Sequence, residues 1–222
     1  MNELIFKEEL IENWIKILLI ISTLLIIAAR LISGDKFQFL IKFWNIDRYF
    51  IFKSGSTIPF FTSLNTLMFF HRINILSLFI TVYLFPYKFY ELQFYNYLMI
   101  SGMILFYIII KYLIEKTISI VLNFKENLVE INRYRIGLKN LISVYLYFYL
   151  IIIIFNPISN KITIIISFIL FIIYLFFSFK YIFKKYSDSS YKGLVYFILY
   201  LCAFEIAPAA IVMLEAFKYL KI

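Results

Sequence analysis

Long stretches without a single charged residue are the feature that most constrains this chain. Residues 97–110 and 162–177 are free of charge, and with their flanks each approaches the roughly 20 apolar residues that a helix needs to cross a bilayer. Of the 222 residues 64% are hydrophobic, and the mean hydropathy is +0.90. Soluble domains are only about 45–50% apolar. The chain is therefore predicted to be an integral membrane protein.

The continuity of these runs favours helices over a transmembrane barrel. Only helices and closed barrels satisfy their backbone groups in lipid, and barrel strands alternate between apolar and polar residues. We therefore expect an all-α fold, a polytopic transmembrane helical bundle that forms one domain over residues 1–222. Six spans are predicted, near residues 14–33, 63–85, 95–114, 138–155, 162–182 and 193–216.

Basic residues near the span ends predict the orientation, because basic loops resist translocation. Fifteen Lys and Arg residues follow the first, third and fifth spans, against six on the opposite side. We expect a multi-pass protein of the bacterial inner membrane with both termini in the periplasm. Lys218 and Lys221 disagree with this orientation, since they suit a cytoplasmic tail.

The net charge of +9 does not indicate a nucleic-acid partner. Basic residues lie between apolar runs and form no single patch with interleaved aromatics. The predicted partners are the lipid bilayer and possible other membrane subunits, with no nucleic acid. Lys111 and Glu115 are four positions apart and are predicted to form a surface pair near a helix end.

Two predicted cytoplasmic connections have amphipathic patterns. In residues 36–53 polar side chains recur every three or four positions among large apolar ones, as in a helix that lies in the membrane interface. Residues 117–136 carry a similar polar stripe, and there the third span could simply continue into the cytoplasm. Both are interpreted as lipid-contact helices, with a partner-docking surface as the alternative.

Aromatic residues cluster between the second and third spans. They are predicted to anchor the chain at headgroup level rather than to bind a ligand: Tyr87, Phe89, Tyr90, Phe94, Tyr95 and Tyr97.

The last span contains a carboxylate, Glu205, close to its middle. A charge at the bilayer centre costs at least roughly 2.5 kcal/mol on insertion scales, so this side chain should face protein or water. Pro208 cannot donate a hydrogen bond to the carbonyl of Phe204, which predicts a kink beside Glu205. Two interpretations stay open: a proton- or ion-handling group at a helix break, or a carboxylate paired with a basic residue to fix helix packing, which we favour.

The second span is the most polar of the six and holds His71 and Arg72. In one interpretation they are partners for Glu205, and His71 takes part in a proton relay. In the other, which we favour, the span begins near Arg72 and both side chains snorkel to the cytoplasmic interface. The apolar stretch from residue 73 to 85 is short, but tilt can accommodate it.

Motifs of the common enzyme classes are absent from the sequence. It has no G-x-S-x-G, H-E-x-x-H or G-x-x-x-x-G-K-[ST] motif, and its one His and one Cys form no metal-binding pattern. We predict no catalytic residues, no metal site and no cofactor.

The last span carries a motif that resembles an uncharacterised family of small integral inner-membrane proteins of Bacteroidota. The motif reads L-Y-L-C-x-x-E-I-x-P over residues 199–208, supported by Arg30-Leu31-Ile32 and Asn156-Pro157. The family usually closes its fourth span with a Leu-Leu-Pro type sequence, from which residues 154–157 depart. The resemblance implies a membrane location but no activity. With His71 and Arg72, the candidate intramembrane functional or packing site comprises Tyr200, Cys202, Glu205 and Pro208.

Three function classes remain open. The first, which we favour, is a non-enzymatic membrane subunit or scaffold of an envelope complex. The second is a small proton- or ion-coupled transporter or channel component that uses Glu205, and the third is an intramembrane enzyme.

Overall fold

The computed structural model describes residues 13–41, 62–84, 94–121, 125–156 and 160–186, together with residues 207, 210 and 211. Every regular element within this part of the chain is helical, which confirms the all-α prediction. The helices are α1 (Asn13–Ile32), α2 (Gly34–Ile41), α4 (Ser63–Phe79), α5 (Phe94–Val121), α6 (Lys125–Phe155) and α7 (Asn160–Tyr186), with a π-helical turn η2 (Ile80–Leu84) continuing α4.

Four helical segments are long and apolar enough to cross a membrane, and they coincide with the first four predicted spans to within about four residues. They are Asn13–Ile32, Ser63–Val82, Phe94–Thr117 and Tyr134–Phe155. The fifth predicted span falls in α7, where Ile165–Lys180 is a shorter apolar helix. The sixth lies outside the described residues apart from positions 207, 210 and 211, which are helical and exposed.

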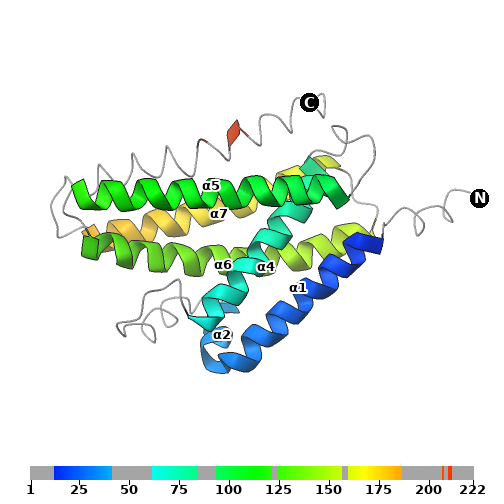
Figure 1. Cartoon of the computed structure of the whole chain (residues 1–222), viewed down its shortest axis with the longest axis horizontal. Coiled ribbons are helices and arrows are strands. Elements are labelled where there is room, and N and C mark those ends of the chain that lie inside the picture. Colours follow the sequence, from blue (N-terminus) through cyan, green and yellow to red (C-terminus); the bar gives the residue numbers. More distant parts are fainter. Residues whose placement is uncertain are drawn as a thin grey trace, which may run out of the picture.

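The helix α4 forms the centre of the bundle. It packs alongside α1 and crosses α5 and α6 obliquely (Figure 1). Of its membrane-crossing window 56% is buried, as in α6, against only 11% for α5. Polar residues are therefore tolerated in α4, because its side chains face other helices and not lipid.

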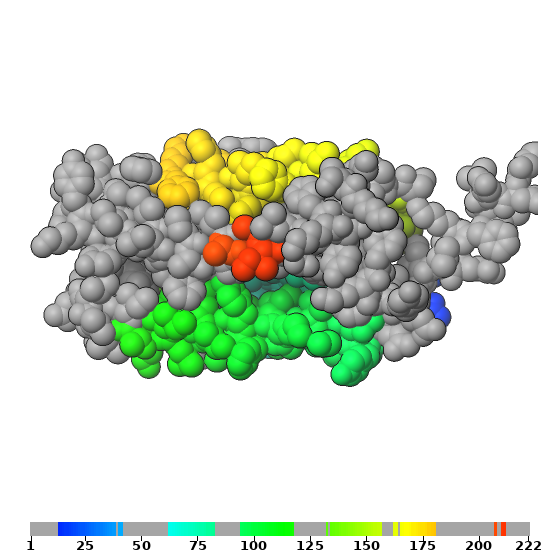
Figure 2. Space-filling view, turned by 90° about the horizontal axis from the view of Figure 1, so that it is seen from above, coloured from blue at the N-terminus to red at the C-terminus, as the bar shows by residue number. Residues whose placement is uncertain are grey.

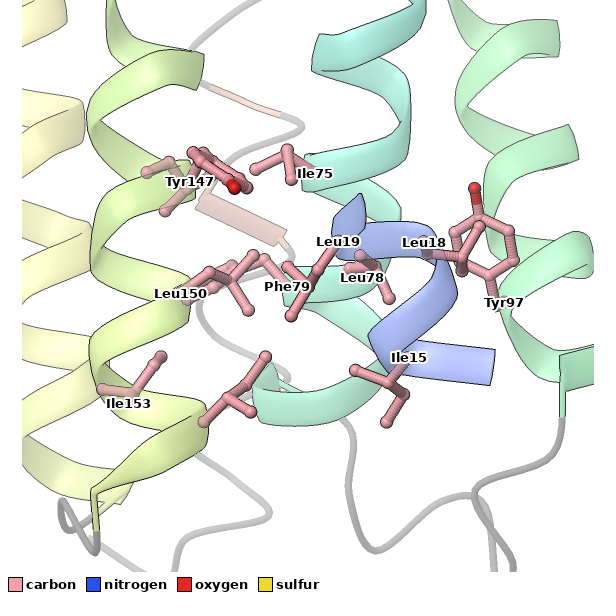
Figure 3. Packing of buried hydrophobic residues seen from close by; sticks show 12 residues of the cluster. Ile15, Leu18, Leu19, Ile75, Leu78, Phe79, Tyr97, Tyr147, Leu150 and Ile153 are labelled. Carbon is pink, nitrogen blue, oxygen red and sulfur yellow. The ribbon is translucent and has the colours of Figure 1, made fainter. Parts of the chain in front are cut away.

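The largest apolar cluster joins α1, α4, α5 and α6 at one level of the bundle (Figure 3). Its fully buried members include Ile75, Leu78 and Leu150, each 0% exposed. Around them pack Ile15, Leu18, Leu19, Phe79, Tyr97, Leu146, Tyr147, Ile153 and Ile154.

The short helix α2 folds back onto the bundle directly after α1. Its apolar residues Phe37 and Leu40 are 2% and 0% exposed and pack with Ala29, Met68 and Val144. The first part of the amphipathic helix predicted over residues 36–53 is therefore present as α2. Its apolar face packs on the protein core, whereas lipid contact was expected. The rest of that segment, residues 42–53, lies outside the described residues.

The helices α5, α6 and α7 are longer than α1 and α4. Figure 1 shows all three running beyond the ends of α1 and α4 on the side where α5 ends and α6 begins. The α5 helix continues past its span to Val121, as one interpretation of residues 117–136 expected.

The α5 and α7 helices also bound one face of the molecule. Figure 2 shows them along opposite margins of this face, with the small described piece of the last segment between them. Large apolar side chains cover their outward surfaces, among them Met103, Phe106, Ile169 and Phe176 at 46% exposure or more. This pattern is the one that lipid contact requires.

Candidate intramembrane polar site

A buried amide on the central helix ties together three helices. The side-chain nitrogen of Asn74 donates to the carbonyl of Leu18 over 2.9 Å and to the hydroxyl of Ser22 over 2.7 Å, both on α1. Its oxygen accepts from the hydroxyl of Tyr97 on α5 over 2.9 Å. Such bonds between membrane helices contribute about 0.6–2 kcal/mol each. Asn74 therefore fixes the register of α4 against both neighbours.

A second polar contact joins α1 to α6. The hydroxyls of Thr23 and Tyr147 lie 2.6 Å apart, and the Thr23 hydroxyl also contacts the carbonyl of Leu19 at 2.9 Å. A carbonyl only accepts, so the single Thr23 proton goes to Leu19. The Tyr147 hydroxyl must therefore be the donor to Thr23.

The imidazole of His71 lies beside the second of these contacts. It is 0% exposed and meets the ring of Tyr147 edge-on, with centroids 5.7 Å apart and an interplanar angle of 69°. Neither ring nitrogen has a hydrogen-bond partner among the described residues.

Asn140 on α6 presents a second buried amide. It precedes Ser143, Val144 and Tyr147 by three, four and seven residues, so it lies on the face of α6 that packs on α4. It is 0% exposed, and both of its side-chain atoms lack a hydrogen-bond partner in the described part of the chain. The buried polar surface is therefore only partly satisfied by the protein itself.

The structure separates the neighbours His71 and Arg72. Arg72 is partly exposed, and its guanidinium lies 5.5 Å from the centre of the Phe69 ring. The favoured prediction that both side chains snorkel to the interface is wrong for His71, because protein encloses it completely. The crossing segment also begins at Ser63 instead of near Arg72.

A separate charged cluster lies where α5 and α6 leave the apolar core. Arg135 approaches Glu115 to 3.6 Å and donates to the side-chain oxygen of Asn132 over 3.1 Å, while Asn132 donates to Glu115 over 2.9 Å. Lys111 and Glu115 are 9% and 7% exposed. The predicted surface position is therefore wrong, because both residues are buried, and Glu115 also bridges to the next helix.

The remaining predicted site residues lie outside the described part of the chain: Tyr200, Cys202, Glu205 and Pro208. Whether Glu205 pairs with His71 or Arg72 stays a prediction. Within the described ranges no group of three or more His, Cys, Asp or Glu side chains comes together.

Sequence reasoning missed several partners in this site. Tyr97 was assigned to the aromatic anchor, yet it is 8% exposed and bonds to Asn74. Ser22 and Thr23 were passed over as ordinary residues of an apolar span. The sequence feature that could have identified them is the presence of two adjacent hydroxyl side chains in the middle of the first span.

Fold and site together define a polytopic helical membrane protein with a partly satisfied polar junction at its core. The chain belongs to the family described as a domain of unknown function (DUF4271), whose model matches residues 15–214. Neither the curated proteins nor the solved structures include a match to this chain.

Proposed function

We propose that this chain is a non-enzymatic subunit or scaffold of an envelope complex in the inner membrane of a bacterium of the Bacteroidota. The observation that carries the proposal is the extension of α5, α6 and α7 beyond α1 and α4 (Figure 1). We call residues 111–121 of α5 and 125–139 of α6 the stalk.

The lengths of the two helices support a projecting stalk. The α5 helix has 28 residues and α6 has 31. At a rise of 1.5 Å per residue they measure about 42 and 46 Å, whereas the hydrocarbon core is about 30 Å thick. At least one end of each helix therefore extends past the hydrocarbon.

The charged residues of the stalk indicate which side of the membrane it faces. The stalk segments contain nine charged residues, which are Lys111, Glu115, Lys116, Lys125, Glu126, Glu130, Arg133, Arg135 and Lys139. By the positive-inside rule, the excess of basic residues supports a position of the stalk at the cytoplasmic end of the bundle. That orientation leaves both termini in the periplasm.

The buried Glu115–Arg135 bridge suits a rigid docking element. An ion pair at 4% and 9% side-chain exposure holds α5 and α6 at one separation, and Asn132 bonds to both partners. This rigidity presents a fixed surface at that end of the bundle, on which Tyr112 and Leu113 are 48% and 55% exposed. Preorganised surfaces lose less entropy when they bind.

The proposal is tested by purification of the full chain in mild detergent, followed by identification of stable partners. Replacing Tyr112 and Leu113 together by Ala should remove the partners, at least tenfold in recovered amount. The matched control is Tyr95→Ala with Leu98→Ala, at 68% and 49% exposure near the other end of α5, which should retain them. A chain that emerges alone and monomeric would refute the subunit function.

A proton- or ion-coupled transporter component is the second candidate. The unpartnered imidazole of His71 inside the bundle favours it, because ionisable groups within a membrane mark ion pathways. In this candidate Glu205 handles the ion. Glu205→Gln should then abolish ion-dependent transport while leaving complex assembly intact, whereas a pure scaffold would show no transport to lose.

A further inference from the structure

Arg72 carries a permanent charge at the middle of a helix long and apolar enough to cross the membrane. The crossing segment runs from Ser63 to Val82, and Arg72 lies midway between these two ends. Half of the roughly 30 Å hydrocarbon layer therefore separates it from either surface, which is farther than an arginine side chain reaches. A guanidinium is not deprotonated in a protein. Its charge therefore needs a counter-charge at that depth.

Arg72 projects from a different face of α4 than His71 does, because consecutive residues of a helix are about 100° apart. His71 is fully buried against the Tyr147 ring of α6. The Arg72 guanidinium instead lies 5.5 Å from the centre of the Phe69 ring, nearly one turn earlier. Phe69, Arg72 and Leu76 form a stripe along α4, and all three are only partly buried. The described helices therefore leave this stripe open to a further neighbour.

The sequence places one basic and one acidic residue at the middle of the six predicted spans. Arg72 is the only basic residue more than three positions inside a span. Acidic residues occur in the last span alone, where Glu205 lies at the middle and Glu215 next to the end. Because each span is predicted to cross the whole membrane, Arg72 and Glu205 are expected at the same depth.

The carboxylates whose side chains the structure describes lie at other depths. Asp35 is exposed on α2, just after the end of α1. Glu115 lies near the end of the crossing segment of α5, 3.6 Å from Arg135. Neither carboxylate is near the middle of a crossing segment, so Glu205 is the acidic residue that matches the position of Arg72.

The described piece of the last predicted span, residues 207, 210 and 211, adjoins the helices that flank α4. Figure 2 shows this piece between α5 and α7, and both Figure 1 and Figure 2 show it level with the middle of α5. The turn η2, which continues α4, also packs against α5 and α7. The same two helices therefore flank the α4–η2 helix and this piece, which begins two residues after Glu205.

We propose that the last predicted span packs on the Arg72 stripe of α4, with Glu205 as the counter-charge of Arg72 at the centre of the membrane. A carboxylate and a guanidinium form two parallel hydrogen bonds in their best geometry. The low dielectric of the interior strengthens their attraction and makes either charge alone costly. Of the two candidate partners for Glu205, this pairing selects Arg72, since His71 faces α6. It is independent of the stalk.

A charge-pair cycle in the full chain tests the pairing. Arg72→Gln and Glu205→Gln each leave a buried charge without its partner, so each should lower the Tm in lipid nanodiscs by at least about 6 °C. The double variant removes both charges and should regain at least half of that loss. Lys16→Gln is the control for the loss of a charge, because Lys16 is exposed near the end of α1. It should change the Tm by less than about 2 °C.

The same variants reveal any other counter-charge of Arg72. If Arg72→Gln lowers the Tm and Glu205→Gln does not, a different anion such as a lipid phosphate neutralises Arg72, and the proposal is wrong. Losses of Tm that add in the double variant would also overturn it.

Cross-linking tests the proximity without removing either charge, so it decides the question even if the charge variants fail to fold. Cys202, the only cysteine, precedes Glu205 by three residues, as Phe69 precedes Arg72. In a six-span arrangement the second and the last span cross in the same direction, so these two positions share a depth. Phe69→Cys should therefore form a disulfide with Cys202 on oxidation with copper phenanthroline, as measured by mass spectrometry of the linked peptides.

Phe70→Cys is the matched control for the cross-link. Phe70 is 56% exposed and lies about 100° further round α4 than Phe69. It should link at least about fivefold less, because disulfides require a narrow geometry. Equal linking of the two variants, or no linking of Phe69→Cys, would overturn the proposal.

Discussion

The side-chain nitrogen of Asn74 on α4 donates to the hydroxyl of Ser22 on α1 over 2.7 Å, and both residues are buried. This contact joins the first predicted span to the second, 52 residues later in the chain. The same amide reaches α5 through Tyr97. The register of three helices therefore depends on one residue.

Asn74→Leu should destabilise the bundle by about 2 kcal/mol. The substitution removes three interhelical hydrogen bonds and leaves the hydroxyls of Ser22 and Tyr97 buried without this partner. Thermal unfolding in detergent measures the effect. Thr66→Ala is the control, since Thr66 is exposed and bonds within its own helix to Thr62, so it should change stability by less than about 0.5 kcal/mol.

Tyr147→Phe should cost about 1 kcal/mol, whereas Tyr147→Ala should cost about 3–5 kcal/mol. The first change removes only the hydroxyl bonded to Thr23, but the second also removes a 5%-exposed ring from the core. Thermal unfolding of both variants under the same conditions measures the two losses of stability. Equal losses would mean that the ring contributes nothing beyond its hydroxyl.

Removing one partner of the buried ion pair should be more harmful than removing both. Arg135→Leu leaves the buried Glu115 carboxylate without this guanidinium, which should cost about 3–5 kcal/mol. The double variant with Glu115→Leu removes the uncompensated charge and should recover most of this loss. A double-mutant cycle measures the coupling. Additive losses would show that the two side chains act independently despite their separation of 3.6 Å.

Leu40→Ala should destabilise the chain by about 2–4 kcal/mol by opening a cavity under α2. Leu40 is 0% exposed and packs in the cluster with Phe37 and Met68. Ile41→Ala is the matched control, because Ile41 is adjacent and 37% exposed. If α2 were held mainly by lipid, both variants would have the same small effect in detergent, as measured by thermal unfolding.

The sequence alone determined the class of fold and the position of the first four spans. A predominantly apolar run of about 20 residues is a local property, and lipid forces its backbone into a helix whatever surrounds it. The sequence also allowed the prediction that α5 continues past its span, as it does to Val121. Length and hydropathy were enough for each of these predictions.

Only the tertiary structure decided which side chains meet inside the bundle. His71 and Arg72 are adjacent in sequence, yet α4 turns the imidazole into the protein and leaves the guanidinium partly exposed. Glu115 lies 3.6 Å from Arg135 of α6, which is 20 residues away in the sequence. These outcomes depend on which face of each helix its neighbours cover. Hydropathy could not predict which face of a helix packs on its neighbours, because apolar side chains suit contact with lipid as well as contact with another membrane helix.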